Sequence, residues 1–241
     1  MLPPQNFHQP QIVVDDSAIY WTEVTSADGV TGSLMMMPFA DSTPRALVAS
    51  VASPSSLAID ADSVYCVAGN EIMKVAKLGG SPQVIAIGNQ PSDLIVDGGS
   101  VLWVNVVDST VMSVPSSGGN LMQLFADVGV MHVAVDGTNV YAAEQASDGS
   151  ILAIPRGGGS VRKLVQLENV PSAIAVDPSH IYWATQLQVR RADLDGSNTE
   201  TLAENRNLTT ALVLDDMYIY WATGGLAVDQ QPGIAKLAKP K

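Results

Sequence analysis

Leu94-Ile-Val-Asp97 and Val101-Leu-Trp-Val104 are two short apolar segments that recur, in the same order, along the chain. The shared pattern is an apolar triplet ending in Asp, with a large apolar or aromatic residue five positions later. The six Asp residues are Asp15, Asp60, Asp97, Asp136, Asp177 and Asp215. Their partners are Tyr20, Tyr65, Leu102, Tyr141, Tyr182 and Tyr220. Successive copies lie 45, 37, 39, 41 and 38 residues apart, so the chain contains six units of about 40 residues.

The third unit shows what each copy contains. Two further apolar runs, Thr110-Val-Met-Ser-Val114 and Leu121-Met-Gln-Leu-Phe125, follow the first two and are separated by a Gly-rich turn. Short runs rich in Val and Ile, bounded by Gly, Pro, Asn and Asp, are typical of strands. No stretch keeps a helical apolar period for three turns, so we expect essentially no helix. The repeat therefore predicts an all-β, six-bladed β-propeller with four antiparallel strands per blade.

The unit boundaries predict one domain over residues 1–241. Its blades are expected at about 8–50, 51–90, 91–128, 129–168, 169–206, and 207–241 together with 1–7. The last unit ends after its third strand, Ile234-Ala-Lys-Leu-Ala238, and counting 13 positions back from Asp15 reaches Leu2. We expect the N-terminal residues to supply the missing outer strand and close the ring, although Pro3 and Pro4 shorten it. The alternative is that the natural closure has been lost.

Composition limits the partners. Twelve Lys and Arg against 24 Asp and Glu give a formal net charge of −12, which repels nucleic acid and anionic membranes. No run of 18 apolar residues is present, so no membrane insertion is expected. The residues from Met1 to Gln5 lack the features of a signal peptide, so an exported protein would have lost that segment. Cys66, the single cysteine, is expected to be buried and inert, and the protein is expected to be a monomer.

Three segments carry a family likeness. Ile19-Tyr-Trp-Thr22, Ile181-Tyr-Trp-Ala184 and Ile219-Tyr-Trp-Ala222 resemble the YWTD repeat of low-density-lipoprotein-receptor-type propellers, in a form similar to bacterial relatives. The stretch from Arg191 to Asn198 is especially similar. The resemblance implies an extracellular or periplasmic module that recognises a protein or peptide on one face, without catalysis. Other six-bladed propellers, such as lactonases of the gluconolactonase type, are calcium enzymes, so fold alone does not choose the class.

The final Asp of the YWTD motif is replaced in every unit. The replacements are Glu23, Ala68, Asn105, Glu144, Thr185 and Thr223. Glu23, Asn105 and Glu144 place oxygen atoms at the ends of second strands, where they could bind calcium at the channel mouth. The alternative is that they bond to loop amides. The six repeat Asp residues are interpreted as structural, because Asp at a strand end accepts hydrogen bonds from turn amides.

A second set of candidates lies just before each predicted first strand. These positions are Gln11, Ser56, Asp93, His132, Ala173 and Ala211. Asp93 and His132 fall in neighbouring units and form the one ionisable pair of the set. A carboxylate beside an imidazole suggests proton transfer or part of a metal site. A histidine in water at the channel rim is the alternative.

The sequence favours a binding module without a cofactor. It lacks a nucleophile elbow, a P-loop, a dinucleotide-binding glycine pattern and a zinc-spaced His or Cys cluster. Two long second-to-third loops, 23–32 and 224–233, are candidates for a shared binding role or for harmless length variation. We therefore expect recognition of a protein, peptide or saccharide through one face. A calcium-dependent hydrolase or lactonase using Glu23, Asn105 and Glu144 with Asp93 or His132, and a scaffold without ligand, are the alternatives.

Overall fold

The fold consists of strands and connecting turns. The computed structural model describes residues 11–26, 30–127, 129–145, 149–166, 170–204, 208–224 and 233–240. In these ranges the regular elements are 23 strands, and no helix is present, which confirms the all-β prediction. The described residues accordingly hold no helix that is long and apolar enough to cross a membrane.

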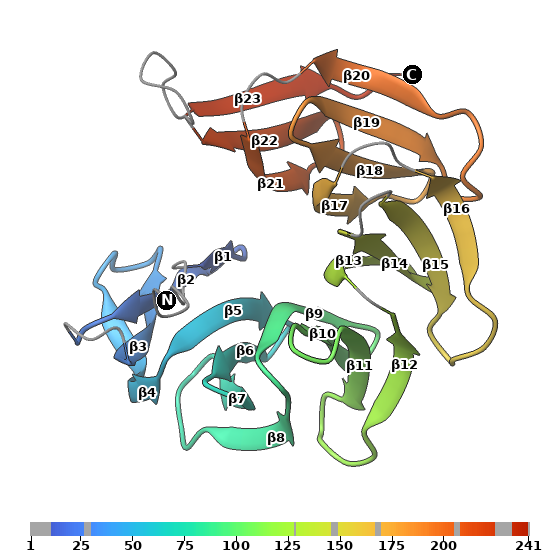
Figure 1. Ribbon diagram of the computed structural model, residues 1–241. Coiled ribbons are helices and arrows are strands. Elements are labelled where there is room, and N and C mark those ends of the chain that lie inside the picture. The colour runs from blue at the N-terminus through green and yellow to red at the C-terminus, as the bar shows by residue number, and fades with distance from the viewer. Residues whose placement is uncertain are drawn as a thin grey trace, which may run out of the picture. The chain divides into compact units, whose positions relative to one another are not determined.

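The strands form antiparallel sheets, and within each sheet neighbouring strands follow one another in chain order (Figure 1). The first sheet contains β1 (Ile12–Val14), β2 (Ala18–Val24), β3 (Thr31–Pro38) and β4 (Arg45–Ala52). The second contains β5 (Pro54–Ile59), β6 (Ser63–Ala68), β7 (Glu71–Ala76) and β8 (Gln83–Ile87). The third contains β9 (Pro91–Asp97), β10 (Ser100–Asn105), β11 (Thr110–Pro115) and β12 (Met122–Ala126). The bounds of β10, β11 and β12 agree within one residue with the strands predicted for the third unit, whereas β9 begins three residues earlier than predicted.

The remaining sheets repeat the arrangement. The fourth contains β13 (Val130–Val135), β14 (Asn139–Glu144), β15 (Ser150–Pro155) and β16 (Arg162–Gln166). The fifth contains β17 (Pro171–Val176), β18 (His180–Thr185), β19 (Gln188–Asp193) and β20 (Glu200–Glu204). The sixth contains β21 (Leu208–Leu214), β22 (Tyr218–Gly224) and β23 (Gly233–Ala238). Leu2, predicted to complete this three-stranded sheet, lies outside the described residues.

The chain divides into two compact units. One consists of Met1–Asp108 and Met112–Met122, and the other of Ser109–Val111 and Gln123–Lys241. In the first unit β5 packs against β2 and β9, and in the second unit β17 packs against β13 and β21. Within each unit, the sheets therefore stack on one another through neighbouring first and second strands.

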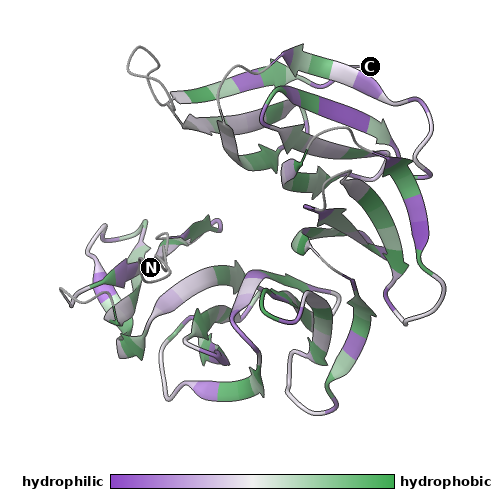
Figure 2. Ribbon diagram, in the orientation of Figure 1, coloured by the Kyte–Doolittle hydropathy of each residue, from purple (hydrophilic) through white to green (hydrophobic). Residues whose placement is uncertain are grey.

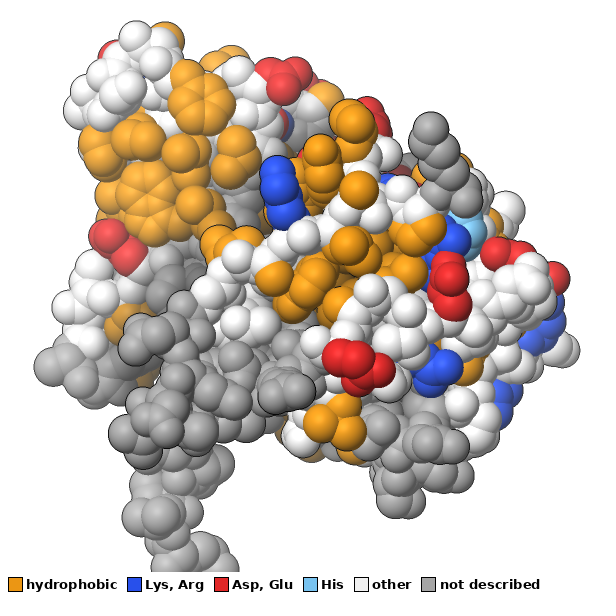
Figure 3. Space-filling view, turned by 90° about the horizontal axis from the view of Figure 1, so that it is seen from above, with side chains coloured by type: hydrophobic (Ala, Val, Ile, Leu, Met, Phe, Trp, Pro, Cys, Tyr) orange, Lys and Arg blue, Asp and Glu red, His pale blue; other side chains and the backbone are white. Residues whose placement is uncertain are grey.

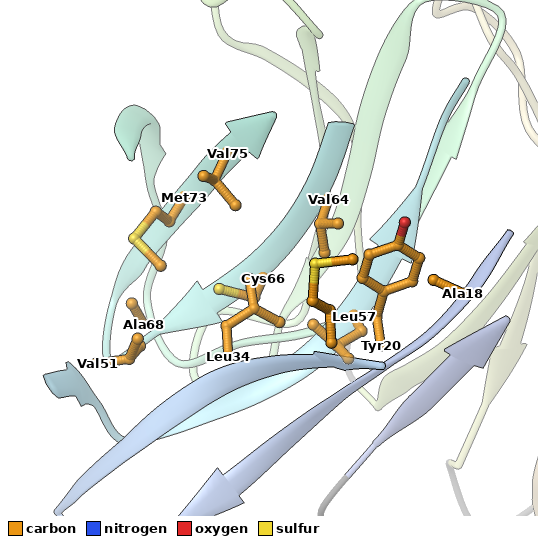
Figure 4. Packing of buried hydrophobic residues seen from close by; sticks show 11 residues of the cluster. Ala18, Tyr20, Leu34, Val51, Leu57, Val64, Cys66, Ala68, Met73 and Val75 are labelled. Carbon is orange, nitrogen blue, oxygen red and sulfur yellow. The ribbon is translucent and has the colours of Figure 1, made fainter. Parts of the chain in front are cut away.

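Apolar side chains between adjacent sheets form the core of each unit. Between the first two sheets, Tyr20 and Leu34 face Leu57 and Cys66, and all four are nearly or fully buried (Figure 4). Similar clusters join the second sheet to the third, the fourth to the fifth, and the fifth to the sixth. A single four-stranded sheet has two faces to cover, so stacking is what buries this apolar area.

In the second, third and fifth sheets the second strand is the most buried strand. All six residues of β6 are buried, as are five of six in β10, β14 and β18. The outer strands β12 and β16 carry hydrophilic stretches by comparison (Figure 2). In the third sheet the first strand, β9, has only two buried residues of seven. The first strand is an edge strand of its sheet, which limits what can cover it.

All first strands except β1 begin earlier than the sequence predicted. β5, β9 and β17 each open on a buried proline: Pro54, Pro91 and Pro171. Proline is compatible with the first residue of an edge strand, because no ladder bond needs its missing N–H there. Each of these strands also contains a register shift, at Ser55/Leu57 in β5 and at Pro171/Ala173 in β17. The shift lets a strand of consecutive apolar residues bend as it passes its neighbour.

Candidate functional site

The repeat Asp residues close the turn between first and second strands. In the fourth sheet, Asp136 Oδ1 accepts the backbone N–H groups of Thr138 and Asn139, each at 2.7 Å. Its Oδ2 accepts the hydroxyl of Tyr141 at 2.8 Å. The same hydroxyl bond joins Asp60 to Tyr65, Asp177 to Tyr182 and Asp215 to Tyr220. The structural interpretation is confirmed for these four Asp residues, whose offset of five from the tyrosine lets one side chain bond both the turn and the hydroxyl.

Lysines extend two of these clusters to the next sheet. Lys77 Nζ lies 2.6 Å from Asp15 Oδ2, and its amine is 5.8 Å from the centre of the Tyr20 ring. Lys239 makes the same pair of contacts, at 2.9 Å from Asp177 and 5.7 Å from the Tyr182 ring. Both lysines directly follow a third strand. These carboxylates are therefore committed to holding sheets together and are not available to a ligand.

The side-chain oxygen of Asn105 is also occupied by hydrogen bonds within the fold. Asn105 is 7% exposed, and its Oδ1 accepts both the indole N–H of Trp103 at 2.8 Å and the backbone N–H of Asn89 at 2.9 Å. A Cβ on Gly88 would lie 2.6 Å from this oxygen, so the loop before β9 packs directly on it. For Asn105 the alternative interpretation, a bond to a loop amide, is confirmed.

Glu23 and Glu144 lie at or near the ends of their strands, as predicted. Glu23 pairs with Ser33 on β3, and Glu144 pairs with Val130 and Ser150 in the fourth sheet. Glu144 is 7% exposed and has a bonding partner, whereas the partly buried Glu23 side chain makes no hydrogen bond or ion pair with the described residues. Glu23 and Asn105 belong to one unit and Glu144 to the other, so a shared site for the three stays a prediction.

Asp93 and His132 lie inside strands, contrary to the prediction that they precede them. Asp93 is the third residue of β9, and His132 is the third residue of β13, paired with Ala143. The backbone N–H of Asp93 donates to Ser56 Oγ at 3.1 Å, and its φ of 55° marks the irregular point of the strand. Asp93 and His132 each make a polar, ring or electrostatic interaction, so neither residue is without a partner. The two residues belong to different units, so their pairing stays a prediction.

A metal centre has no ready donor group in the ranges that the structure covers. No three His, Cys, Asp or Glu side chains gather closely enough there to hold an ion. Cys66 is fully buried, as predicted, and burial raises the pKa of its thiol to about 12, which keeps it protonated and unreactive.

The two long loops differ in how much of them is described. The first is shorter than predicted, because β2 continues to Val24 and β3 begins at Thr31. The backbone N–H groups of Thr25 and Ser26 both donate to the Thr31 carbonyl, at 2.9 and 3.0 Å. In the second loop, residues 225–232 lie outside the described residues.

Two buried donors were missed by the sequence interpretation. Trp183 Nε1 and Arg190 Nε are both buried, and neither meets a hydrogen-bond acceptor in the described part of the chain. Their side chains face one another across β18 and β19, with the Arg190 Cζ 5.7 Å from the Trp183 ring centre. Aligning the third strands of the repeats would have shown an Arg where other units hold Met, Leu or Ala.

Comparisons with known proteins identify the fold class. No family model and no curated protein sequence matches the chain. An oligogalacturonate lyase in complex with manganese matches with a TM-score of 0.69 at 15% identity, over 93% of this chain and 74% of that one.

Two further solved structures are similar. A gluconolactonase from Xanthomonas campestris matches with a TM-score of 0.63 at 16% identity, over 86% of this chain and 79% of that chain. A nidogen/laminin complex matches with a TM-score of 0.61 at 16% identity, over 79% and 76% of the two chains. These structures are β-propeller proteins, so the likeness shows a β-propeller fold, while the count of six blades and the YWTD family stay predictions.

Proposed function

We propose that this chain is a non-enzymatic binding module, a six-bladed YWTD-like propeller that recognises a protein, peptide or saccharide through one face. We place the binding face at the ends of the second and fourth strands. In each antiparallel sheet these two ends lie at the same edge, together with the loops that follow them. We further propose that the module acts outside the cytoplasm as a monomer and binds no nucleic acid.

Exposed apolar residues on these loops are the observation that carries the proposal. They are Val24, Val30, Val107, Val170 and Leu187, which are between 36% and 57% exposed. Val24 ends the second strand β2, and each of the others lies just after a second strand or just before a first or third strand. Exposed apolar side chains favour a binding role where they form a patch, and Figure 3 shows hydrophobic side chains gathered on one face of the molecule. The nidogen in a laminin complex supports protein recognition as one use of such a fold.

The alternative is a calcium-dependent hydrolase or lactonase. Its support is the likeness to the gluconolactonase and to a calcium-binding regucalcin from Agrobacterium tumefaciens, together with the Glu23 carboxylate, which makes no hydrogen bond or ion pair within the described residues. Against it, Asn105, one of the predicted calcium ligands, already uses its oxygen for Trp103 and Asn89. We therefore rank binding first.

A thermal melt separates the two functions. The protein is melted in calcium, in magnesium and in chelator at equal ionic strength, alongside Glu23→Gln. Calcium at 100 times its dissociation constant would stabilise the protein by about 2.7 kcal/mol, or roughly 5 to 10 °C. We expect no such shift. A calcium-specific shift that Glu23→Gln abolishes would replace the binding module with the enzyme.

The binding face itself is tested by paired variants. Wild-type protein is screened against a peptide-display library and a glycan array, and each hit is measured with Val107→Ser and Leu187→Ser. Leu78→Ser is the control, because Leu78 is fully exposed on a turn at the opposite edge of its sheet. We expect the loop variants to weaken binding about tenfold or more and Leu78→Ser to leave it unchanged. The reverse result would place binding at the other edge.

A further inference from the structure

Arg190 occupies a position that is apolar in the corresponding units. It pairs across the strands with Trp183. The residues paired in the same way are Met35 with Trp21, Met73 with Cys66, Leu152 with Ala142, and Ala235 with Trp221. A guanidinium therefore replaces a small or apolar side chain on a sheet face that packs against the fourth sheet.

The two donor atoms, Trp183 Nε1 and Arg190 Nε, are both buried from solvent. Trp183 has no exposed surface and belongs to the core cluster that includes Tyr141, Ile151 and Val165. Arg190 is partly buried, with its Nε atom buried, and it makes no ion pair and no hydrogen bond within the described residues. Within the described residues, the Arg190 guanidinium makes a cation–π contact with the Trp183 ring. A cation over an aromatic ring is favourable, but the ring satisfies neither N–H.

The third sheet shows what this tryptophan lacks. There the indole N–H of Trp103 donates to Asn105 Oδ1, two residues later. The corresponding residue in the fifth sheet is Thr185, whose Oγ1 accepts the backbone N–H groups of Leu187 and Gln188 at 3.2 and 3.1 Å. Thr185 thus serves the turn and leaves Trp183 Nε1 without its acceptor.

We propose that Trp183 and Arg190 bind a small carboxylate anion where the fourth and fifth sheets meet. A buried N–H without an acceptor is costly, so an anion that accepts from both Trp183 Nε1 and Arg190 Nε removes two such penalties together. The Nε and one Nη of an arginine form a planar fork that matches the two oxygens of a carboxylate. The indole N–H provides a further donor to the same group. This site does not depend on the proposed function.

Formate is the probe for the test. Tryptophan fluorescence and the melting temperature are followed as formate replaces fluoride at constant ionic strength, for wild type, Arg190→Met and Trp183→Phe. Arg162→Met is the matched control, because it removes the same charge from an exposed position on β16. Arg190→Met is expected to fold, since methionine stands at the corresponding places in β3 and β7.

The expected result is a saturable response in wild type and in Arg162→Met. At ten times the dissociation constant, formate should raise the melting temperature by about 3 to 6 °C. Arg190→Met should lose the response, and Trp183→Phe should weaken binding about tenfold or more. An equal response in Arg190→Met, or none in wild type, would overturn the site. Equal saturation by chloride would overturn the assignment of a carboxylate.

Discussion

At the scale of single residues, the repeat Asp residues connect local sequence to stability. Asp136 accepts two backbone N–H groups and two hydroxyls, those of Thr138 and Tyr141. Each of these bonds involves a charged acceptor, which makes it stronger than a bond between neutral groups. The motif is therefore a stability determinant rather than a ligand site.

Replacing Asp136 with Ala should destabilise the protein by about 2 to 3 kcal/mol, because the turn amides and the Tyr141 hydroxyl lose their acceptor. Asp136→Asn keeps one oxygen for the amides and should cost less. Asp16→Ala should lie within about 0.5 kcal/mol of wild type, because Asp16 is exposed. Urea denaturation measures all three. Equal values for Asp136→Ala and Asp16→Ala would contradict the role given to the motif.

The same groups predict the acid limb of the stability curve. Burial alone would raise the pKa of Asp60, but hydrogen bonds from Tyr65 and from the amides of Asp62 and Ser63 outweigh burial and lower that pKa. The pKa of Asp136 is lowered in the same manner. A lowered folded-state pKa gives stability that is present above the unfolded value, about 3.9, and lost as pH falls through the folded value. Melting temperature should therefore drop steadily below about pH 4.

The tyrosines predict the alkaline limb. Burial first, and then the hydrogen bond to Asp136, raise the pKa of Tyr141 to about 12, and Tyr182 is raised to about 12 by burial and the charge of Asp177. A raised folded-state pKa gives stability that is complete below the unfolded value, about 10, and lost as pH rises toward 12. Tyr141→Phe should flatten the fall in melting temperature between pH 10 and 11. An unchanged profile in this variant would argue against the assignment.

At the scale of elements, a glycine sets how closely two sheets approach. Gly196 has a φ of 89°, and a Cβ there would lie 2.4 Å from the Leu164 carbonyl oxygen on β16. Gly158 has a similar φ of 79° but no atom within 4 Å of its Cβ position. Comparing alanine substitutions at Gly158 and Gly196 therefore distinguishes the cost of backbone strain from the cost of a steric clash between neighbouring sheets.

Gly158→Ala should cost about 1 kcal/mol, which is the strain of a left-handed conformation. Gly196→Ala should cost about 2 kcal/mol more, because the fifth sheet must move away from the fourth and open their shared core. Each kcal/mol corresponds to a shift of roughly 2 to 4 °C in melting temperature for a chain of this length. Similar melting temperatures for the two variants would mean that the sheets separate at little cost.

At the scale of the whole molecule, the single six-bladed domain stays a prediction with a direct solution test. A compact chain of 241 residues has a radius of gyration of about 18 Å. Small-angle X-ray scattering should give about this value, and heat should unfold the protein in one transition. A clearly larger radius, together with two separate transitions, would show instead that the two compact units behave as independent domains.

The strands and the structural Asp turns could be predicted from the sequence because their bonds join near neighbours. Asp136 and Tyr141 are five positions apart, and a repeat displays that offset several times. The first residue of each strand and its register within the sheet were harder to predict from the sequence. Counting back from the repeat Asp placed Asp93 and His132 before their strands, because the count could not include prolines and register shifts inside an edge strand.

The sequence by itself determined an all-β repeat and its Asp turns, since short apolar runs, turn residues and repeat spacing are local properties of a chain. Only the tertiary structure decided which polar groups were still available. Asn105 accepts the amide N–H of Asn89, Lys77 pairs with Asp15, and Arg190, beside Trp183, has no counter-charge in the described part of the chain. Such outcomes depend on which side chains arrive in the same buried space after folding, and burial makes each missing or completed bond count in the free energy.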